Sequence, residues 1–396
     1  MLRCVTALSF VINGMAFHAS AFVKYGTTYH SLINFYVKPT VLSTSRCFAT
    51  LALDTEESVK RVVFLGTPDV AATTLRALHQ DSMKIGSPYQ IVSVITQPPK
   101  RRKRNGPVVA SPVGLAAEDL GIPVVSPDKA NDPSFLYDLE TSVRPDLCIT
   151  AAYGQYLPKR FLATPTYGTV NIHPSLLPRW RGASPVQRAL ECGDNPVGVS
   201  VLFTVSKMDA GPIISQVAKE ISINDQATTV LPMLFDIGTQ LLIEAIPDIL
   251  SAKVTMDTAT IQDESSVVLA SMIDASEAEL RVWEESALTC HNRIRGFSTW
   301  PGTFCYLKIG DEDPVKHKII ETRVLDECMP VRQVLEMGPS KHDGLRMVCC
   351  DGSVLEILKL QPNTRNVMDA KSFVNGLQGR NVMWVKNPKS ALVSNE

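Results

Sequence analysis

Asn171 and His173 carry the side chains best suited in this sequence to support reaction at a carbonyl group. They stand two positions apart at the end of an expected strand over residues 169–172, so both side chains leave the same face. Ligands of open α/β sheets bind beyond the carboxyl ends of the strands, where an amide beside an imidazole can hold a developing oxyanion. Taken alone, the pair also fits a histidine that makes only a structural hydrogen bond.

A carboxylate, Asp209, follows His173 by 36 residues in a short polar turn, residues 207–211, between two apolar segments. A carboxylate close to His173 would favour the imidazolium form and could relay a proton through water. The glycine-flanked, hairpin-like setting also suits an aspartate that only closes an Asx turn. Both roles stay open, because the sequence does not place Asp209 in space.

Five consecutive cations, Lys100, Arg101, Arg102, Lys103 and Arg104, interrupt the chain directly after an expected strand. Adjacent like charges repel one another, and contact with phosphate groups would relieve that repulsion in a strongly salt-dependent way. Arginine can also stack on an unpaired base. The cluster favours contact with a nucleic acid, and a solvated loop is the alternative.

Short apolar, β-branched segments alternate with helical segments from residue 61 onward. Thr67 and Pro68 are expected to start the first helix, as its N-cap and first residue. The repetition predicts an α/β fold, a Rossmann-like domain with a doubly wound parallel sheet over residues 58–250. Strands are expected over residues 61–65, 91–95, 147–151, 169–172, 199–203 and 213–221, and helices over 113–120, 133–139 and 228–250.

The pattern changes after residue 250. Residues 251–271 are rich in Ser, Thr and Asp and have no sustained period, which predicts a linker over residues 251–284. A helix is expected over residues 287–295, ending at Gly296, and Asp351-Gly352 is a hairpin signal between two β-rich segments. Residues 285–390 are therefore expected to form a small β-rich domain, either a barrel or a sandwich.

The composition is that of an ordinary soluble globular protein, with 45% hydrophobic residues and a net charge of −1 over 396 residues. It excludes long disordered or fibrous structures, and the body of the chain has no apolar segment long enough to predict a membrane span. The nine cysteines include no C-x-x-C pair, which argues against a disulfide scaffold or a zinc ribbon. We expect no metal site.

The first 53 residues differ in charge from the remainder. They contain four of the 39 basic residues and none of the 40 acidic ones, so an excess of five acidic side chains remains in the body. This predicts an organelle-targeting presequence over residues 1–53, disordered and outside the fold. A signal-like segment followed by a hydroxyl-rich one suggests a plastid stroma, and a single mitochondrial matrix presequence is equally open. A folded N-terminal extension is the third possibility.

Residues 61–386 resemble the methionyl-tRNA formyltransferases along nearly their whole length. The similar motifs are Phe64-Leu-Gly-Thr-Pro-Asp69, Thr96-Gln-Pro98, Ser111-Pro-Val113, Ala152-Tyr-Gly154 with Leu157-Pro158, the segment from Asn171 to Gly182, Met208-Asp-Ala-Gly211, Trp300-Pro301 and Leu360-Gln-Pro362. Formyltransferases generally share the Asn, His and Asp. The segment that ends in Pro178-Arg-Trp-Arg-Gly182 and the C-terminal match indicate the tRNA-specific members.

The resemblance implies transfer of a formyl group from 10-formyltetrahydrofolate to the α-amine of methionyl initiator tRNA. Asn171 and His173 would then stabilise the tetrahedral oxygen, and Asp209 would assist proton transfer. The folate would lie beside Ser175, Leu176, Leu177, Pro178 and the Tyr153 loop, and the cations at 100–104 would contact the acceptor arm. It further implies a C-terminal OB-like β-barrel, and no metal is needed for formyl transfer to an amine.

Two other classes of function are consistent with parts of this pattern. One is a formyltransferase or formyl-folate hydrolase that acts on a small molecule, but neither needs the second domain or the cationic loop. The other is an RNA-binding protein with an inactive site, against which the intact Asn171, His173 and Asp209 argue. We predict a monomeric enzyme of organellar translation initiation, without membrane association.

Overall fold

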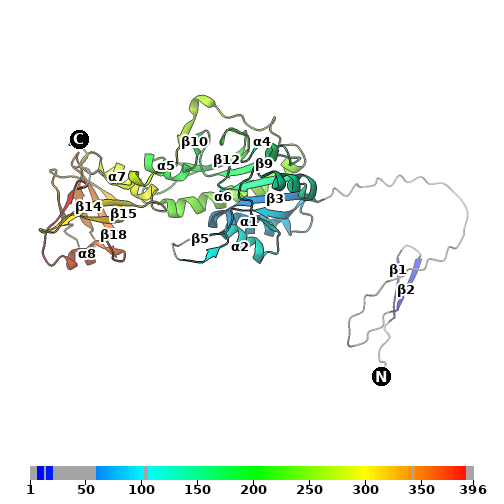
Figure 1. Ribbon diagram of the computed structural model, residues 1–396, viewed down its shortest axis with the longest axis horizontal. Helices are drawn as coiled ribbons and strands as arrows, with labels where there is room; N and C mark the ends of the chain where they lie inside the picture. Colours follow the sequence, from blue (N-terminus) through cyan, green and yellow to red (C-terminus); the bar gives the residue numbers. More distant parts are fainter. Residues whose placement is uncertain (1–6, 13–14, 21–58, 102–105, 341–342, 389–396) are drawn as a thin grey trace, which may run out of the picture. The chain divides into compact units, whose positions relative to one another are not determined.

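The computed structural model describes residues 7–12, 15–20, 59–101, 106–340 and 343–388, and the chain divides into two units, residues 1–55 and 56–396. In the first unit, β1 (Ala7–Ile12) and β2 (Met15–Ser20) form an antiparallel hairpin (Figure 1). This differs from the disorder expected for the presequence, because both segments are apolar enough to pair as strands. The rest of residues 1–53 lies outside the described residues.

A seven-stranded sheet forms the centre of the second unit, in the order β12-β11-β9-β8-β3-β4-β7. The five strands from β9 to β7 are parallel, whereas β11 runs antiparallel to β9 and to β12. The predicted α/β fold is confirmed, but the sheet is mostly rather than entirely parallel. The strands are β3 (Lys60–Gly66), β4 (Tyr89–Ile95), β7 (Val124–Val125), β8 (Leu147–Ala151), β9 (Thr169–His173), β11 (Val197–Phe203) and β12 (Ile213–Lys219).

The strand order reverses direction beside β3. From β3 the chain moves outward through β4 and β7 on one side and through β8 and β9 on the other. The carboxyl ends of β3 and β8 therefore flank a topological switch point, where ligands of such sheets bind. Gly66 and Ala151 pair at this point, and a Cβ on Gly66 would lie 2.9 Å from the Ala151 carbonyl oxygen, so the close approach requires glycine.

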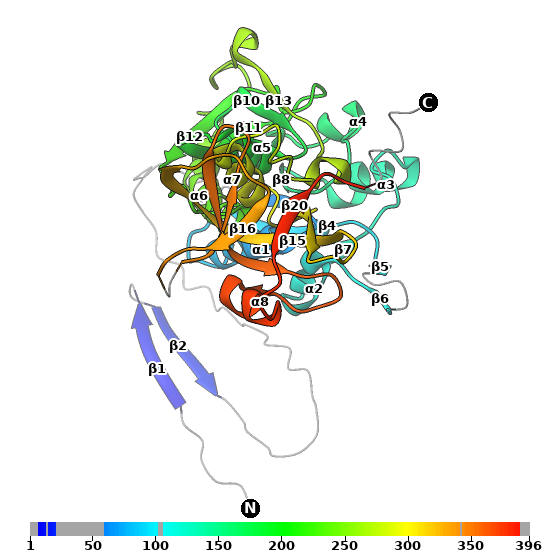
Figure 2. The same cartoon turned by 90° about the vertical axis from the view of Figure 1, so that its left-hand side faces the viewer.

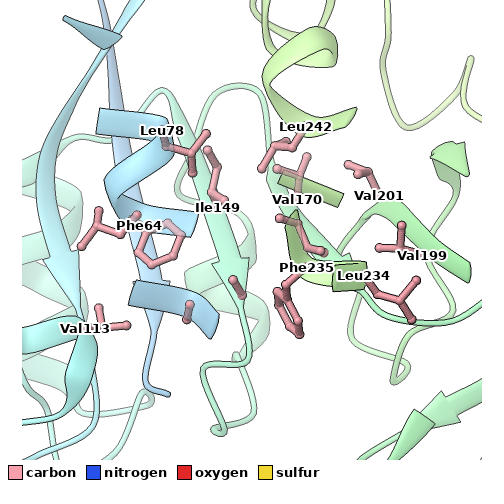
Figure 3. Packing of buried hydrophobic residues seen from close by; sticks show 14 of the residues in the cluster. Phe64, Leu78, Val113, Ile149, Val170, Val199, Val201, Leu234, Phe235 and Leu242 are labelled. Carbon is pink, nitrogen blue, oxygen red and sulfur yellow. The ribbon is translucent and has the colours of Figure 1, made fainter. Parts of the chain in front are cut away.

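Helices cover both faces of the sheet, because neighbouring strand residues point in opposite directions. Val62 and Phe64 of β3 pack with α1 (Asp69–Ser82), α2 (Pro112–Asp119) and α6 (Ala227–Leu250), and Val63 and Leu65 pack on the other face. Figure 3 shows Leu234, Phe235 and Leu242 of α6 against Val170, Val199 and Val201 of the strands. Burial of each such side chain contributes ~1.5–3 kcal/mol.

The opposite face carries α3 (Pro133–Asp138), a π-helical turn over Leu139–Val143 and α4 (Lys159–Leu162). Helix α6 is long and apolar enough in composition to span a membrane, but its apolar residues pack in the core, with Val230 and Ile246 fully buried. The remaining helix of this domain, α5 (Pro185–Cys192), contacts α7 (Ala287–Gly296), where a Cβ on Gly296 would lie 2.8 Å from the Gln187 carbonyl oxygen.

A six-stranded antiparallel β-barrel follows (Figure 2). It confirms the predicted β-rich domain, and of the two expected forms, barrel and sandwich, the barrel is the one observed. It closes because β15 pairs with both β14 and β18. The predicted Asp351-Gly352 turn joins β17 and β18. Its elements are β14 (Thr303–Ile309), β15 (Val315–Cys328), β16 (Val334–Met337), β17 (Leu345–Val348), β18 (Ser353–Gln361) and β20 (Val382–Val385), with β19 (Met368–Asp369) and α8 (Ala370–Gly376) beside them.

The segment predicted as a linker, residues 251–284, is packed against the protein rather than free. Thr260 bridges to Ile213, and β13 (Val268–Ala270) pairs in parallel with β10 (Arg179–Gly182). Two 3₁₀ turns, Glu264–Ser266 and Ala275–Ala278, lie on either side of β13. The loss of hydrophobic period predicted a linker, but backbone pairing and buried polar groups hold this segment in place.

The N-cap predicted for the first helix is wrong. Pro68, not Thr67, is the N-cap residue of α1, and it makes no side-chain capping bond. The Thr67 hydroxyl instead donates to the carbonyl oxygen of Tyr153 at 2.8 Å. This bond ties the turn after β3 to the loop after β8, across the switch point.

Candidate active site

Asn171 is the middle residue of β9, two positions before its carboxyl end, and lies directly opposite Thr150 of β8. The Thr150 hydroxyl donates to Asn171 Oδ1 at 2.8 Å and lies 3.1 Å from the Val170 carbonyl oxygen. Because Oδ1 is the acceptor in this bond, the amide orientation is fixed, and Nδ2 is the group that can donate to a ligand. The predicted amide donor therefore has a partner that aligns it.

His173 is 5% exposed, and both nitrogens of its ring face oxygen atoms. Nε2 lies 2.9 Å from the carbonyl oxygen of Trp180, so Nε2 carries a proton and donates it. Nδ1 lies 3.7 Å from Oδ2 of Asp209, which is an ion-pair distance longer than a hydrogen bond. Nδ1 is therefore the nitrogen that can gain or lose a proton during a reaction.

Asp209 completes the cluster from the connection between β11 and β12. Its Oδ2 accepts a hydrogen bond at 2.9 Å from the backbone N–H of Gly182, the last residue of β10 (Arg179–Gly182). The carboxylate thus contacts residues far away in the sequence rather than closing its own turn. Asp209, which the sequence could not place, therefore lies beside His173 at the carboxyl end of β9, the strand that also carries Asn171.

The predicted folate-binding side chains are mostly buried in the protein. Leu177 packs with Leu202 and Ile213, and the Ser175 hydroxyl donates to the Arg179 carbonyl oxygen at 2.8 Å. Pro178 and Leu176 are half-buried. A ligand at this segment would therefore meet Leu176 and Pro178 rather than the side chains of Ser175 and Leu177.

Tyr153 is also buried, whereas the residues that follow it are accessible. A cavity of about 510 Å³ lies beside this loop, lined by Gln97, Asp128, Lys129, Ala130, Asn131, Gly154, Gln155, Tyr156 and Pro158. Tyr156 is 67% exposed, and its hydroxyl donates to the Ser206 carbonyl oxygen at 3.2 Å. The loop after β8 and the loop that carries Asp209 are joined by this bond.

The cationic cluster falls partly within the described residues. Lys100 and Arg101 form β5, which pairs with β6 (Val108–Val109), and both side chains are exposed. Lys100 Nζ donates to Gln97 Oε1 at 3.0 Å, next to the cavity beside Tyr153. Arg102, Lys103 and Arg104 lie outside the described residues. Among the residues that the structure describes, no group of three or more His, Cys, Asp or Glu could hold a metal ion.

Residues 60–246 match the formyl transferase family, and residues 272–378 match the formyl transferase C-terminal domain. The methionyl-tRNA formyltransferase of Methylococcus capsulatus is 35% identical over 322 residues, which cover 80% of this chain and 96% of that protein. That of Listeria innocua is 36% identical over 324 residues, covering 81% and 97%. The chain belongs to the methionyl-tRNA formyltransferase family.

This methionyl-tRNA formyltransferase family member is a formyl-transfer enzyme, and its family uses formyl-tetrahydrofolate. The solved structure of WlaRD, a sugar 3N-formyl transferase in the presence of dTDP and 5-N-formyl-THF, has a TM-score of 0.53. It is 16% identical and covers 78% of this chain and 99% of that one. At this identity the likeness shows a shared fold.

Two positions of the candidate site were missed by sequence reasoning. Thr150 was expected within a strand over residues 147–151. It lies near the carboxyl end of this apolar segment and is the one residue in it with a hydroxyl group. That position was a usable signal for a ligand-facing residue. The N–H of Gly182 has no side-chain signal, because any residue except proline supplies a backbone donor.

Proposed function

We propose that this enzyme transfers a formyl group from 10-formyltetrahydrofolate to the α-amine of methionyl initiator tRNA, for translation initiation in an organelle. The observation that carries the proposal is the convergence of Asn171, His173 and Asp209, with Asp209 Oδ2 3.7 Å from His173 Nδ1. Two observations support it: the chain is about 35% identical to a methionyl-tRNA formyltransferase, and ligands of open α/β sheets bind at such strand ends.

The three side chains can divide the steps of an acyl transfer among them. The α-amine attacks the formyl carbon, and the carbonyl electron pair moves to oxygen, where Asn171 Nδ2 and a proton-bearing His173 Nδ1 donate to it. Asp209 accepts the proton that the amine loses. Collapse of the intermediate breaks the bond between the formyl carbon and N10 of the folate. That nitrogen takes up the proton that Asp209 received, and tetrahydrofolate leaves.

The tRNA proposal rests on the cationic cluster as well as on the relatives. Lys100 and Arg101 are exposed and can approach phosphate groups, and Lys100 bonds to Gln97 at the edge of the cavity beside Tyr153. The alternatives are a small-molecule formyltransferase, a formyl-folate hydrolase or an inactive RNA-binding protein. None of these requires both the three-residue cluster and the cationic loop.

The acceptor is tested by offering labelled formyl-folate with charged initiator tRNA, charged elongator tRNA and free methionine. We expect formylation of the initiator far above the other two. Equal formylation of free methionine would contradict the tRNA proposal, and release of formate without an acceptor would indicate a hydrolase. No transfer to any acceptor, with retained tRNA binding, would indicate an inactive RNA-binding protein.

The role of the loop is tested by changing all five cations, Lys100 to Arg104, to glutamine. The KM for tRNA is expected to rise about tenfold or more and to become less sensitive to salt, because up to five phosphate contacts are lost. Binding of the folate should stay the same. The control is a variant with Lys84→Gln and Lys253→Gln. These two lysines are exposed cations outside the loop, and each pairs with an aspartate. A fall in folate affinity with unchanged tRNA kinetics would refute the loop assignment.

The proposed organelle rests on the acid-free composition of residues 1–53. A fusion of residues 1–60 to a fluorescent reporter should direct the reporter to mitochondria or to a plastid, and the stain that coincides with it decides between the two. Diffuse cytosolic fluorescence would contradict an organellar enzyme. A matched fusion in which Arg3, Lys24, Lys38 and Arg46 are changed to glutamine should lose the targeting.

A further inference from the structure

Gln262 lies in the segment between the two domains, and its side chain reaches into the loop that carries Asp209. It is 6% exposed. Its Nε2 donates to the carbonyl oxygens of Asp209 at 2.8 Å and Gly211 at 2.7 Å, and its Oε1 accepts from Arg181 Nε at 2.9 Å. The side-chain amide of Gln262 thus connects two residues of the Asp209 loop with the buried guanidinium of Arg181.

The Asp209 loop has a backbone conformation that needs support from outside. Asp209 has a φ of 48°, in the left-handed region that is unfavourable for residues with a side chain. At Gly211 the chain passes so close to β11 that a Cβ would lie 1.7 Å from the carbonyl oxygen of Phe203. The carbonyls of these two residues are the ones that Gln262 binds.

Arg181 connects Gln262 with the group that holds the Asp209 carboxylate. Its side chain is 2% exposed, and Nη1 lies 3.0 Å from Oε1 of Glu264. The next residue is Gly182, whose N–H donates to Asp209 Oδ2 at 2.9 Å. Glu264 in turn pairs with Lys207, at the start of the Asp209 loop. Residues 262 and 264 therefore hold both ends of this loop.

The segment around Gln262 is itself fixed on both sides. Thr260 and Ile213 exchange two backbone hydrogen bonds, of 2.8 and 2.9 Å. On the other side, Asp263 accepts the N–H of Ser265 at 2.9 Å and caps the short 3₁₀ turn. A side chain anchored in this way can determine the position of its partner rather than follow it.

We propose that Gln262 is a positioning residue for formyl transfer, which sets the distance between the Asp209 carboxylate and His173. The segment between the domains is then a wall of the active site and not only a connection. This inference rests on the proposed proton-transfer role of Asp209. A change at Gln262 should lower kcat, because the carboxylate moves, and leave the KM for folate and for tRNA nearly the same.

The test is a double-mutant cycle of Gln262→Glu and Asp209→Asn, measured as single-turnover transfer to charged initiator tRNA. Gln262→Glu has the same shape but turns the two donor bonds into contacts between oxygens, so the rate should fall about tenfold to thirtyfold. In the Asp209→Asn background the same change should have almost no further effect, because the group it positions is already absent. An equal fall in both backgrounds would overturn the inference.

Two further measurements separate this inference from the role of Asp209 and from misfolding. If Asp209→Asn alone kept full turnover, the proposed role of Asp209 would fail, whatever Gln262 does. Gln262→Met repeats the cycle if the glutamate variant does not fold, and it should lower the rate similarly. Gln226→Glu is the matched control and should keep the rate. It removes a hydrogen bond of 3.0 Å that the side-chain amide of Gln226 donates to the Ile320 carbonyl oxygen at the domain junction.

Discussion

Two buried histidines, His173 in the candidate active site and His291 at the junction of the two domains, have nearly the same surroundings. They are 5% and 3% exposed, and each lies with Nε2 2.9 Å from a backbone carbonyl oxygen, of Trp180 and Ile223 respectively. They differ at Nδ1. Nδ1 of His173 faces the Asp209 carboxylate at 3.7 Å, whereas Nδ1 of His291 accepts a hydrogen bond from the Thr322 hydroxyl at 2.9 Å.

The partner of Nδ1 decides what each histidine can do. A hydroxyl that donates to Nδ1 fixes the neutral ring, and burial holds the pKa of His291 below its usual value, opposed by the bond to Ile223 and assisted by the charge of Arg295. A carboxylate can instead exchange a proton with the ring and stabilise its charge. The same residue type therefore serves domain packing in one place and chemistry in the other.

The largest expected effect comes from changing each histidine to glutamine, which can still donate to the backbone carbonyl. His173→Gln should lower kcat by about 10²–10³, the range for loss of one oxyanion donor, and move the unfolding temperature by only a few degrees. His291→Gln should lower the unfolding temperature and keep kcat. Rates of transfer and thermal melts of both variants check this, and equal losses of kcat would remove the contrast.

A smaller effect is expected at Thr150, which aligns the amide of Asn171. Thr150→Val keeps the shape and removes one hydrogen bond of about 1 kcal/mol, so kcat should fall about fivefold to tenfold. Thr150→Ser keeps the hydroxyl and should restore most of the rate. A fall in both variants alike would mean that packing, and not the hydroxyl, matters at this position.

The smallest effect concerns the pH dependence of stability. The pKa of His291 is lowered by folding, so the unfolded chain binds a proton first as the pH falls below about 6.5. The contribution of His291 to stability is therefore full above that pH and is lost as the pH falls toward its folded pKa. Urea unfolding of wild type and His291→Gln at pH 8 and pH 5.5 should show a smaller pH difference in the variant. If the variant showed the same pH difference in stability as wild type, the neutral state assigned to the His291 ring would be wrong.

Strands and helices were largely predictable because their hydrophobic period is local. The strand over residues 147–151 and the helix that ends at Gly296 were predicted within one residue of their observed bounds. Asn171 and His173 could be paired because a separation of two residues on a strand fixes a shared face. These inferences need no knowledge of the rest of the fold.

The remaining features depend on contacts between distant segments. Asp209 reaches His173 only because the β11–β12 connection folds back over β9, and Gln262 has no local pattern that marks it as part of the site. The buried direction of the Leu177 side chain is set by packing against β11 and β12, and that of Ser175 by the bond of its hydroxyl to the Arg179 carbonyl oxygen. Similarly, Thr67 has the sequence of an N-cap, but its hydroxyl bonds across the switch point instead.

The central claim is that Asp209, beside His173, takes the proton of the attacking amine, and single-turnover formyl transfer by Asp209→Asn tests it most directly. Asparagine keeps the shape and can still accept the Gly182 N–H, but it cannot take the proton of the amine. We expect a rate at least about 100-fold below wild type, with unchanged folate affinity, while Asp119→Asn, at an exposed pair with Arg76, keeps the full rate. Transfer at the wild-type rate by Asp209→Asn would contradict the account.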